Sequence, residues 1–456
     1  MAGIGFELRK LLERDSLLGM LQAYAYAGII SSGPWILSIL GILLIGVMSL
    51  TIVIPSTLIT QFQVSVTYLI ACSLTLTGFA QLAFTRFCAD RLFEKKAALI
   101  LPNFRGISLL ITLLAGGLAL PLLYMGFRDS SEYYRQLMLA GFVIMCNIWI
   151  ATLFLSSMKQ YKSILAMFAL GYGVTIFLSL ALRPMKLEGL LTGFVIGHFV
   201  LLGGMILLIE HNFPSSEFLR FDFLKKNQVF ISLAVVGLFY NLGLWLDKFM
   251  FWIHPSTSIP VIGLLRASPI YDIPVFLAYL SIIPGMAVFL VKMETDFVEY
   301  YDAFYEAVRG GGSLEELEQW RNDIVFTVRQ GIYQIIKIQS ISALLVLVVG
   351  RQLLHLLGIS ELYLPLLFVN LIAAALQVVF LGILNVFFYL DQRRMVLLLT
   401  ACFCLGNGLF TGLSLYLGPG WFGDGYALSL LVAVALGFYL LNRKLDQLEY
   451  ETFMFQ

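Results

Sequence analysis

The sequence predicts an all-α membrane protein that crosses the bilayer about twelve times, and three observations support this prediction. The 456 residues are 60% hydrophobic and only 12% charged, with a mean hydropathy of +0.89, whereas a soluble protein would be about 25% charged. The apolar residues form long unbroken runs, unlike the alternating segments of about 10 residues in a membrane β-barrel. A polar stretch, Glu210–Gln228, has six such runs before it and six after it.

A charged, amphipathic segment opens the chain at residues 1–22. Its apolar and charged side chains recur at helical spacing on opposite faces. The apolar face holds Ile4, Leu8, Leu11 and Leu12, and the charged face holds Glu7, Arg9, Lys10, Glu13 and Arg14. This pattern predicts a helix that lies in the membrane interface before the first span. We expect no cleavable signal peptide, because the first apolar run is too long for one.

The apolar runs are long enough to cross a bilayer, which takes about 20 residues at 1.5 Å per residue. They lie at residues 23–51, 62–86, 106–126, 135–157, 163–183, 188–209, 229–252, 270–292, 331–350, 362–389, 395–417 and 424–442. Most of the 29 Lys and Arg residues fall in the exposed regions on the side of the N-terminus. The excess of positive charge predicts that both termini are cytoplasmic. We therefore expect two six-span lobes, at residues 23–225 and 226–456.

The longest segment between spans, within residues 293–330, alternates acidic and aromatic side chains. Its aromatic residues include Tyr300, Tyr301, Phe304 and Tyr305. Three glycines then interrupt it, and Ser313-x-x-Glu316 has the pattern of a capping box that starts a second short helix. The segment is predicted to be cytoplasmic. It is either a solvated face or a docking surface for a cytoplasmic partner.

The first span contains an unusual interruption, Ser31-Ser32-Gly33-Pro34-Trp35. Pro34 cannot donate to the helix ladder and its ring crowds the preceding turn, while the two serines can bond the freed carbonyls. We expect a bent or locally unwound helix. Broken helices often mark the substrate path of transporters, so Ser32, Gly33, Pro34 and Trp35 are path candidates. A packing kink is the alternative, because Gly and Pro are common in membrane helices.

Polar residues inside the predicted spans are the remaining functional signal, since ionisable groups in a membrane are costly and often functional. Asp247 and Lys248 lie near the outward end of span 229–252, and Arg266 and Asp272 lie near the start of the next span. They predict a charged cluster where one span ends and the next begins, with Asp247, Arg266 and Asp272 as candidates for the substrate path. For Lys248 we favour a salt bridge at the membrane interface.

Three uncharged polar residues also lie near the middle of predicted spans. His198 could relay a proton, although a hydrogen bond to a neighbouring helix is the alternative. For Asn147 and Gln377 we expect hydrogen bonds between helices.

Motifs for catalysis are missing from the sequence. It has no GxxxxGK[ST], GxSxG, HExxH or Asp-x-Asp, and no loop long enough to fold a nucleotide-sugar domain. Cys402-x-Cys404 lacks the spacing of a metal site, and a net charge of +1 gives no reason to expect a nucleic-acid partner. We therefore expect no catalytic residue, metal or cofactor. The chain is predicted to be a transporter or a scaffold rather than an enzyme.

Four stretches of the sequence are characteristic when taken together. They are MAGIGFELRKL at residues 1–11, GIISSGPW at 28–35, SPIYDIP and AYLSIIPGM within 268–286, and LNVFFYLDQRR at 384–394. These stretches resemble the PelG family of Pel exopolysaccharide export in bacteria. The resemblance extends over essentially the whole chain. It implies the multidrug/oligosaccharidyl-lipid/polysaccharide exporter superfamily, with two six-helix lobes around a central cavity and alternating access. In that superfamily spans 1, 2, 7 and 8 generally face the cavity.

The resemblance also implies a function and partners. The chain would export Pel polysaccharide, a polymer rich in N-acetylgalactosamine and galactosamine, across the inner membrane for the biofilm matrix. Its partners would be the cytoplasmic Pel glycosyltransferase, a cyclic-di-GMP receptor in the membrane and a further membrane subunit of the Pel synthase. Two alternatives stay open. One is an ion-coupled small-molecule exporter of the same fold, with His198, Asp247 and Asp272 binding the coupling ions. The other is a non-transporting scaffold of the synthase.

Overall fold

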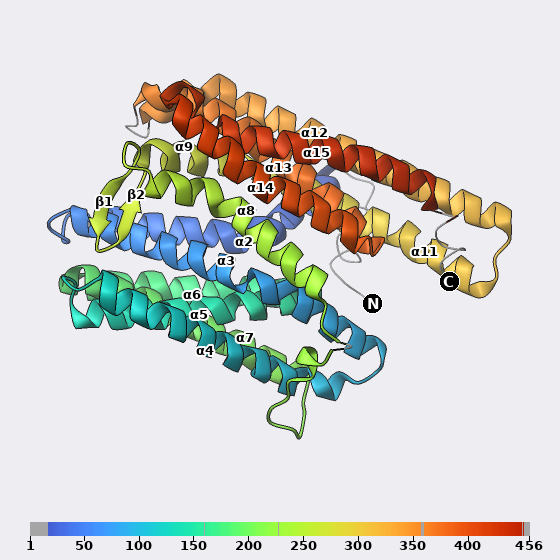
Figure 1. Cartoon of the computed structure of the whole chain (residues 1–456), viewed down its shortest axis with the longest axis horizontal. Coiled ribbons are helices and arrows are strands. Elements are labelled where there is room, and N and C mark those ends of the chain that lie inside the picture. The colour runs from blue at the N-terminus through green and yellow to red at the C-terminus, as the bar shows by residue number, and fades with distance from the viewer. Residues whose placement is uncertain (1–16, 159, 227, 357–359, 449, 451–456) are drawn as a thin grey trace. The chain divides into compact units, whose positions relative to one another are not determined.

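The computed structural model describes residues 17–158, 160–226, 228–356, 360–448 and 450, which form helices joined mostly by short turns (Figure 1). The α-helices are α2 (Leu17–Ser49), α3 (Thr57–Phe93), α4 (Ile100–Gly126), α5 (Glu132–Ser157), α6 (Tyr161–Leu182), α7 (Lys186–Asn212), α8 (Ile231–Ile253), α9 (Pro269–Leu280), α10 (Ile282–Val291), α11 (Phe297–Gly310), α12 (Leu314–Leu356), α13 (Leu364–Tyr389), α14 (Arg393–Leu417) and α15 (Asp424–Asp446). The predicted interfacial helix falls on residues 1–22, of which 1–16 lie outside the described residues.

Shorter elements connect the helices. An antiparallel hairpin, β1 (Ile259–Ile262) and β2 (Leu265–Ala267), follows α8. A π-helical segment, η4 (Lys292–Asp296), joins α10 to α11. The 3-10 turns are η1 (Ala97–Leu99), η2 (Arg183–Met185), η3 (Asp222–Leu224), η5 (Glu361–Tyr363) and η6 (Pro419–Trp421).

The helices are numerous and apolar enough for a multi-pass membrane protein, as predicted. Within the described part of the chain, nine helical segments could cross a membrane, or eleven if each of two bent pairs is one span. One of the nine, Tyr161–Asn212, is 52 residues long and contains both α6 and α7, which pack on each other. When α6 and α7 are counted separately, the count of eleven becomes twelve, which is the number of predicted spans.

Helices α6 and α7 run antiparallel and pack closely through small residues. A Cβ atom added to Gly193 would lie 2.3 Å from the backbone nitrogen of Ser179, and one added to Gly197 would lie 2.0 Å from Oγ1 of Thr175. The residue number rises along α7 as it falls along α6, so the pair is an antiparallel hairpin. Close approach through small residues is how helices pack in membranes, where little hydrophobic force drives them together.

Packing divides the chain into two compact units. The C-terminal unit comprises Met1–Ser32, Leu246–Met250 and Pro269–Gln456, and the N-terminal unit comprises Gly33–Trp245 and Phe251–Ser268. The predicted lobes are instead two continuous stretches of sequence, residues 23–225 and 226–456. The two divisions differ because α2 and α8 each contribute residues to both units.

The N-terminal unit is built around α5, which packs against α3, α4 and α7. Phe84 lies at the centre of an aromatic cluster, with its ring centroid 5.7 Å from that of Phe223 and 6.3 Å from that of Phe154. Asn147 of α5 donates to the Thr112 hydroxyl of α4 (3.0 Å). This contact is the hydrogen bond between helices that we expected for Asn147.

The C-terminal unit is built around α13, which packs against α9, α12, α14 and α15. Its predicted span 270–292 is broken into α9 and α10 at Ser281. The Ser281 carbonyl accepts hydrogen bonds from Gln339 Nε2 (3.0 Å) and Ser342 Oγ (2.9 Å), both on α12. Pro284 just beyond the break cannot donate to the helix ladder. Side chains of α12 therefore satisfy a carbonyl at the break.

The segment between the eighth and ninth predicted spans forms a helical hairpin, α11–α12. Ser313 Oγ accepts a hydrogen bond from the backbone nitrogen of Glu316 (3.2 Å), as a capping box requires. The prediction of a second short helix here is wrong, because α12 runs unbroken for 43 residues into predicted span 331–350. That stretch contains no proline to stop it. Figure 1 shows the tip of the hairpin extending beyond the ends of α13 and α14.

Candidate functional site

The interruption in the first span does bend α2. The segments Gln22–Pro34 and Ile36–Ser49 form one of the two bent helix pairs. The Ser31 hydroxyl donates to the Gly28 carbonyl (3.3 Å). The carbonyl that Pro34 frees is that of Ile30, so this bond is not the one we expected. Ser32 and Gly33 are buried and Pro34 is half-buried, while the side chain of Trp35 lies outside what the structure describes. Their place on a substrate path stays a prediction.

The most elaborate polar site lies inside the C-terminal unit and is centred on Asp247 of α8. The side chain of Asp247 is 0% exposed. Its Oδ2 accepts from the Tyr271 hydroxyl of α9 (2.6 Å), and its Oδ1 accepts from Asn407 Nδ2 of α14 (3.2 Å). Two helices besides α8 thus supply hydrogen bonds to one buried carboxylate.

Lys248, the next residue, supplies the balancing positive charge. Its Nζ donates to both Asp247 oxygens, at 3.2 and 3.0 Å. The same ammonium lies 4.4 Å from the ring centroid of Tyr426 and 5.3 Å from that of Tyr279, so both rings contribute cation–π attraction. The predicted salt bridge of Lys248 exists. It lies in the interior of the unit, however, because Asp247 and two aromatic rings enclose the ammonium.

A second layer of hydrogen bonds extends the site to α13 and α15. The hydroxyls of Tyr279 and Tyr426 are 2.9 Å apart, and Tyr426 also donates to Gln377 Oε1 of α13 (2.8 Å). Gln377 thus takes part in the hydrogen bond between helices that we expected. Thr411 donates to Asn407 Oδ1 (2.8 Å) and so orients that amide toward Asp247. We call these eight residues the Asp247 network: Asp247, Lys248, Tyr271, Tyr279, Gln377, Asn407, Thr411 and Tyr426.

Two other members of the predicted charged cluster have different surroundings. Arg266 of β2 donates from Nε to the Ser258 hydroxyl (2.8 Å) and from Nη2 to the Ser258 carbonyl (3.1 Å). Its guanidinium is therefore held within the loop and hairpin that follow α8. Asp272 lies in the first turn of α9 and is half-buried. Their roles on a substrate path stay predictions.

His198 of α7 lies in the N-terminal unit and is 1% exposed. Its Nδ1 lies 2.8 Å from the Phe194 carbonyl and its Nε2 lies 3.2 Å from the Tyr172 hydroxyl of α6. A neutral ring with its proton on Nδ1 satisfies both contacts, because the Tyr172 hydroxyl can donate to Nε2. This geometry contains the helix-to-helix hydrogen bond that was the alternative to a proton relay.

The four predicted docking aromatics of α11 pack largely within the C-terminal unit. Phe304 is fully buried, and the Tyr300 ring lies 6.3 Å from that of Trp320 on α12. Tyr301 donates to the Tyr389 carbonyl of α13 (2.8 Å), and its ring centroid lies 4.6 Å from that of Tyr305. These contacts fix α11 against α12 and α13. Docking of a partner on this segment stays a prediction.

The π-helical segment η4 brings a carboxylate to the end of α13 that the sequence did not single out. Glu294 accepts from the Tyr389 hydroxyl (3.1 Å) and from Asn385 Nδ2 (3.4 Å). Single-turn π segments within α-helices often occur at functional sites. Asn385 and Tyr389 belong to the fourth stretch that carries the family resemblance, so this end of α13 combines an irregular backbone with that motif.

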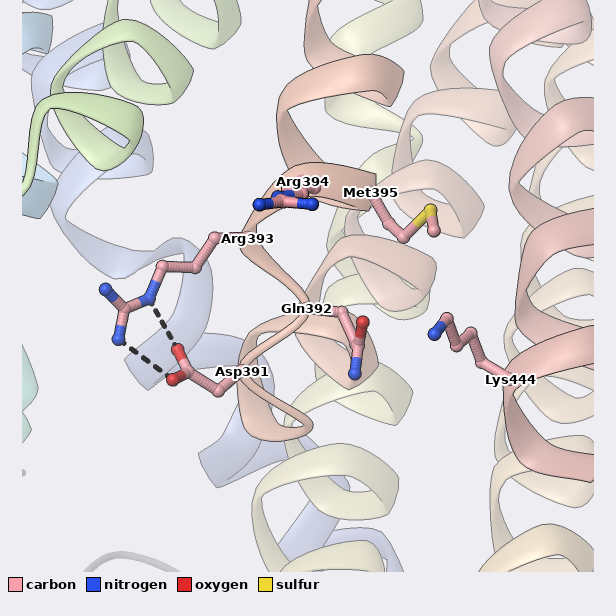
Figure 2. Close-up of a pocket in the computed structure, with 6 residues that line it drawn as sticks. All are labelled: Asp391, Gln392, Arg393, Arg394, Met395 and Lys444. Atoms are coloured by element: carbon pink, nitrogen blue, oxygen red, sulfur yellow. Dashed lines mark hydrogen bonds and ion pairs between the residues drawn. The ribbon is translucent and has the colours of Figure 1, made fainter. Parts of the chain in front are cut away.

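A shallow basic pocket adjoins the same motif, where α13 ends and α14 begins (Figure 2). Arg393 donates to both carboxylate oxygens of Asp391, at 2.8 and 2.9 Å. Asp391 has φ of 51°, which turns the chain between the two helices. The lining residues are Asp391, Gln392, Arg393, Arg394, Met395 and Lys444. Arg393, Arg394 and Lys444 make the pocket basic, and all three lie on the predicted cytoplasmic side. Across the described residues, no group of three or more His, Cys, Asp or Glu could hold a metal ion.

Solved structures with a similar fold are membrane transporters. An outward-facing multidrug resistance MATE family transporter of the MOP superfamily has a TM-score of 0.63 and 14% identity, over 93% of this chain and 96% of that one. A MOP superfamily transporter from Pyrococcus furiosus Vc1 has a TM-score of 0.60 and 14% identity, over 93% and 96%. MATE in its bent conformation has a TM-score of 0.61 and 13% identity, over 98% and 97%. The fold is that of MATE-like transporters.

The fold and the apolar helices thus define a multi-pass membrane protein with a MATE-like fold. A comparison with curated proteins gave no match. The family model of the PelG exopolysaccharide exporter (EPS-E) matches residues 1–453. The chain therefore belongs to the PelG family, as the four stretches of sequence indicated.

Proposed function

We propose that this chain exports Pel polysaccharide across the bacterial inner membrane, for the biofilm matrix. The observation that carries the proposal is the match of an exopolysaccharide exporter family over residues 1–453, on a chain with a transporter fold. The sequence has no nucleotide-sugar domain, so polymerisation would fall to a separate glycosyltransferase. Both termini would be cytoplasmic, which fusions of a topology reporter to each terminus would test.

The predicted path residues would play different parts in export. The bend at Ser32–Trp35 would be a hinge of the first span. Arg266 and Asp272 would lie beside the route of the polymer. Asp247 would act indirectly, because its carboxylate is buried and occupied by Lys248, Tyr271 and Asn407. We propose that it positions α8 rather than contacts sugar.

The α11–α12 hairpin is the proposed docking element for the cytoplasmic Pel glycosyltransferase. Its tip extends beyond the neighbouring helices of its unit (Figure 1). The packed aromatic residues Tyr300, Tyr301, Phe304 and Tyr305 would give it a fixed shape, and exposed Leu314 and Phe326 would be available for contact. The cyclic-di-GMP receptor and the further membrane subunit would complete the synthase.

Deletion of the gene, with measurement of both secreted polymer and synthase activity, tests the export function. We expect secreted Pel polymer to disappear, while the isolated glycosyltransferase still polymerises its nucleotide sugar in vitro. Re-expression of the wild-type chain should restore secretion. Normal secretion in the deletion strain would refute the proposal.

An ion-coupled exporter of small molecules is the second candidate, and the MATE-like fold favours it. Its predicted ion ligands have partners within the chain, since Asp247 holds Lys248 and His198 bonds to Tyr172. Proteoliposomes containing only this chain decide between the two candidates. Drug flux driven by a proton or sodium gradient would support ion coupling, and its absence would support polymer export. A scaffold that does not transport would still support secretion after its path had been blocked.

A further inference from the structure

The turn from α13 into α14 ends the fourth stretch that carries the family resemblance, and the proposed export function gives it no role. It comprises residues 391–394 and lies within the C-terminal unit, as does Lys444 of α15. These residues and Met395 line the basic pocket, which has a volume of about 440 Å³. One water molecule occupies roughly 30 Å³, so the pocket has room for a small hydrated anion.

The basic residues of the pocket are not equivalent. Figure 2 shows Arg393 and Asp391 paired on one side of the turn, with the side chains of Gln392 and Lys444 on the other. Both carboxylate oxygens of Asp391 accept from Arg393, so the charges of this pair cancel. Arg394 and Lys444, which is half-buried in the last turn of α15, supply the remaining charges. The pocket therefore keeps two positive charges.

Arg394 differs from basic residues elsewhere on the predicted cytoplasmic side, several of which bond a carboxylate. Arg91 bonds Glu94 (2.8 Å), and Lys292 bonds Asp296 (2.6 Å). Arg394, by contrast, is exposed and makes no hydrogen bond or ion pair with any residue that the structure describes. A guanidinium has five N–H donors and no acceptor of its own. The donors of Arg394 are therefore available to an anion in the pocket.

The donors that line the pocket suit an anion with several oxygens. Arg394 offers a planar fork that matches two oxygens of a phosphate, and Lys444 offers rotatable donors on a point charge. Helix α14 also begins here, and Gln392 before it makes no side-chain capping bond. The first N–H groups of a helix add donors at the positive end of its dipole. A phosphate group has both the charge and the number of oxygens to use these donors together.

The position of the pocket indicates where such a group would come from. The pocket lies where α13 ends, α14 begins and α15 ends, and each of these helices is long and apolar enough to cross a membrane. Lipid phosphates lie just outside the hydrocarbon core, at the ends of the spans. The cytoplasmic leaflet also carries the anionic lipids that attract Lys and Arg. A lipid headgroup is therefore the source that the position favours.

We propose that this pocket binds a phosphate group, with Arg394 and Lys444 as its charged ligands. The group belongs either to an anionic lipid headgroup, which the position favours, or to a soluble phosphate compound. The Asp391–Arg393 pair neutralises one side of the pocket and fixes the turn. The inference does not depend on the proposed export function, because the ligand is not the polymer.

The test uses the purified full-length chain in an uncharged detergent and has two arms. In the lipid arm, native mass spectrometry measures how much dioleoylphosphatidylglycerol stays bound, with zwitterionic dioleoylphosphatidylcholine as the reference. In the soluble arm, calorimetric titration measures the binding of inorganic phosphate, with chloride as the reference. The variants Arg394→Gln and Lys444→Gln each remove one charge from the pocket. The matched control, Arg443→Gln, removes the same charge from an exposed neighbour on α15 that does not line the pocket.

We expect phosphatidylglycerol to bind in preference to phosphatidylcholine. Arg394→Gln and Lys444→Gln should each weaken this binding by about fivefold, as expected for one basic residue beside an anionic lipid. Arg443→Gln should leave the binding nearly unchanged. Asp391→Asn should strengthen it, because the variant removes the negative charge of the pocket, and asparagine tolerates the φ of 51° at this position. This gain distinguishes the loss of a ligand from general damage to the turn.

The two arms decide between the sources of the phosphate and can also refute the site. Inorganic phosphate that binds with the same order of variants, without any preference for phosphatidylglycerol, would support the site and assign it to a soluble phosphate compound. Absence of binding in both arms would overturn the proposal. So would an equal loss in Arg443→Gln, which would show a general attraction between basic residues and anionic lipid. Weaker binding in Asp391→Asn would contradict the charges assigned to the pocket.

Discussion

Each compact unit buries one conspicuous polar site, and the two are built differently. In the C-terminal unit, Asp247 and Lys248 are contacted by side chains from three other helices, α9, α14 and α15. In the N-terminal unit, His198 has a backbone carbonyl on its own helix and one hydroxyl on α6. The difference follows charge, because a neutral ring needs only its two nitrogens satisfied, whereas a buried ion pair needs most of its lone pairs and protons satisfied.

This contrast implies different consequences of mutation. Removing one member of a buried ion pair leaves the other charged and unpaired, while removing a neutral group leaves at most an unsatisfied hydroxyl or carbonyl. The cost of a substitution should therefore fall from the Asp247 network to His198, and again to a charged residue that lies outside the spans.

The largest effect is expected for Asp247→Asn. The asparagine keeps a polar side chain near Tyr271 and Asn407 but leaves the Lys248 ammonium buried without a carboxylate. Breaking a buried pair in this way costs about 3–5 kcal/mol. We expect a corresponding fall in the free energy of unfolding, measured by denaturation of the purified chain in mixed micelles.

The matched control removes both charges at once. In the double variant Asp247→Asn, Lys248→Met no charge is left unpaired, and methionine fills much of the volume of the lysine stem. Most of the lost stability should return, because replacing a whole buried pair by apolar groups is often neutral. Because Asp247 is proposed to position α8, export should stay impaired in this stable variant. A single variant as stable as wild type would contradict the account of the network.

A smaller effect is expected for His198→Leu. It removes the ring's bonds to the Phe194 carbonyl, which keeps its backbone bond within α7, and to the Tyr172 hydroxyl, which also bonds to Ser38. The loss of these bonds costs about 0.5–1.5 kcal/mol each. Tyr172→Phe removes only one hydroxyl and should cost less. Export should continue in both variants wherever the chain is folded, because the geometry serves packing between α6 and α7. Loss of export in a well-folded His198→Leu chain would instead identify a proton relay.

Most of the fold could be predicted from the sequence, because a membrane span is recognised from the hydropathy of its own residues. Each of the twelve predicted segments corresponds to a helix or, at 270–292, to the broken pair α9 and α10. The prediction went wrong at α12, where polar residues before 331 suggested a separate helix although nothing in the backbone chemistry stopped α12 there. Extent beyond the membrane depends on tertiary packing, which hydropathy does not report.

Only part of the Asp247 network could be predicted from the sequence. The sequence drew attention to Asp247 and Lys248 as charges in a span, but adjacent residues on a helix do not face each other, so spacing does not predict their pairing. Their partners Tyr271 and Asn407 lie 24 and 160 residues from Asp247 along the chain. Asn407 was missed, although an amide flanked by two glycines in the middle of a span was an available signal.

The smallest effect is expected for Asp222, in the polar loop between α7 and α8. Burial alone would raise the pKa of Asp222, but hydrogen bonds from Lys225 (2.5 Å) and Asn103 (3.1 Å) and the charge of Arg220 outweigh it and lower the pKa below its ordinary value. Since the folded pKa is lowered, the stabilisation is complete above the unfolded pKa of about 3.9 and is lost as the pH falls through the folded pKa.

Asp222→Asn should therefore reduce the free energy of unfolding at pH 7 by about 1 kcal/mol or less, as expected for a pair with an exposed partner. The difference from wild type should shrink below about pH 4, where the wild-type carboxylate in the unfolded chain also takes up a proton. Parallel unfolding curves from pH 7 to pH 3 measure this directly, with Lys225→Met as the control that removes the partner. A difference that grows toward low pH would have the wrong sign, and would show that burial rather than hydrogen bonding dominates at Asp222.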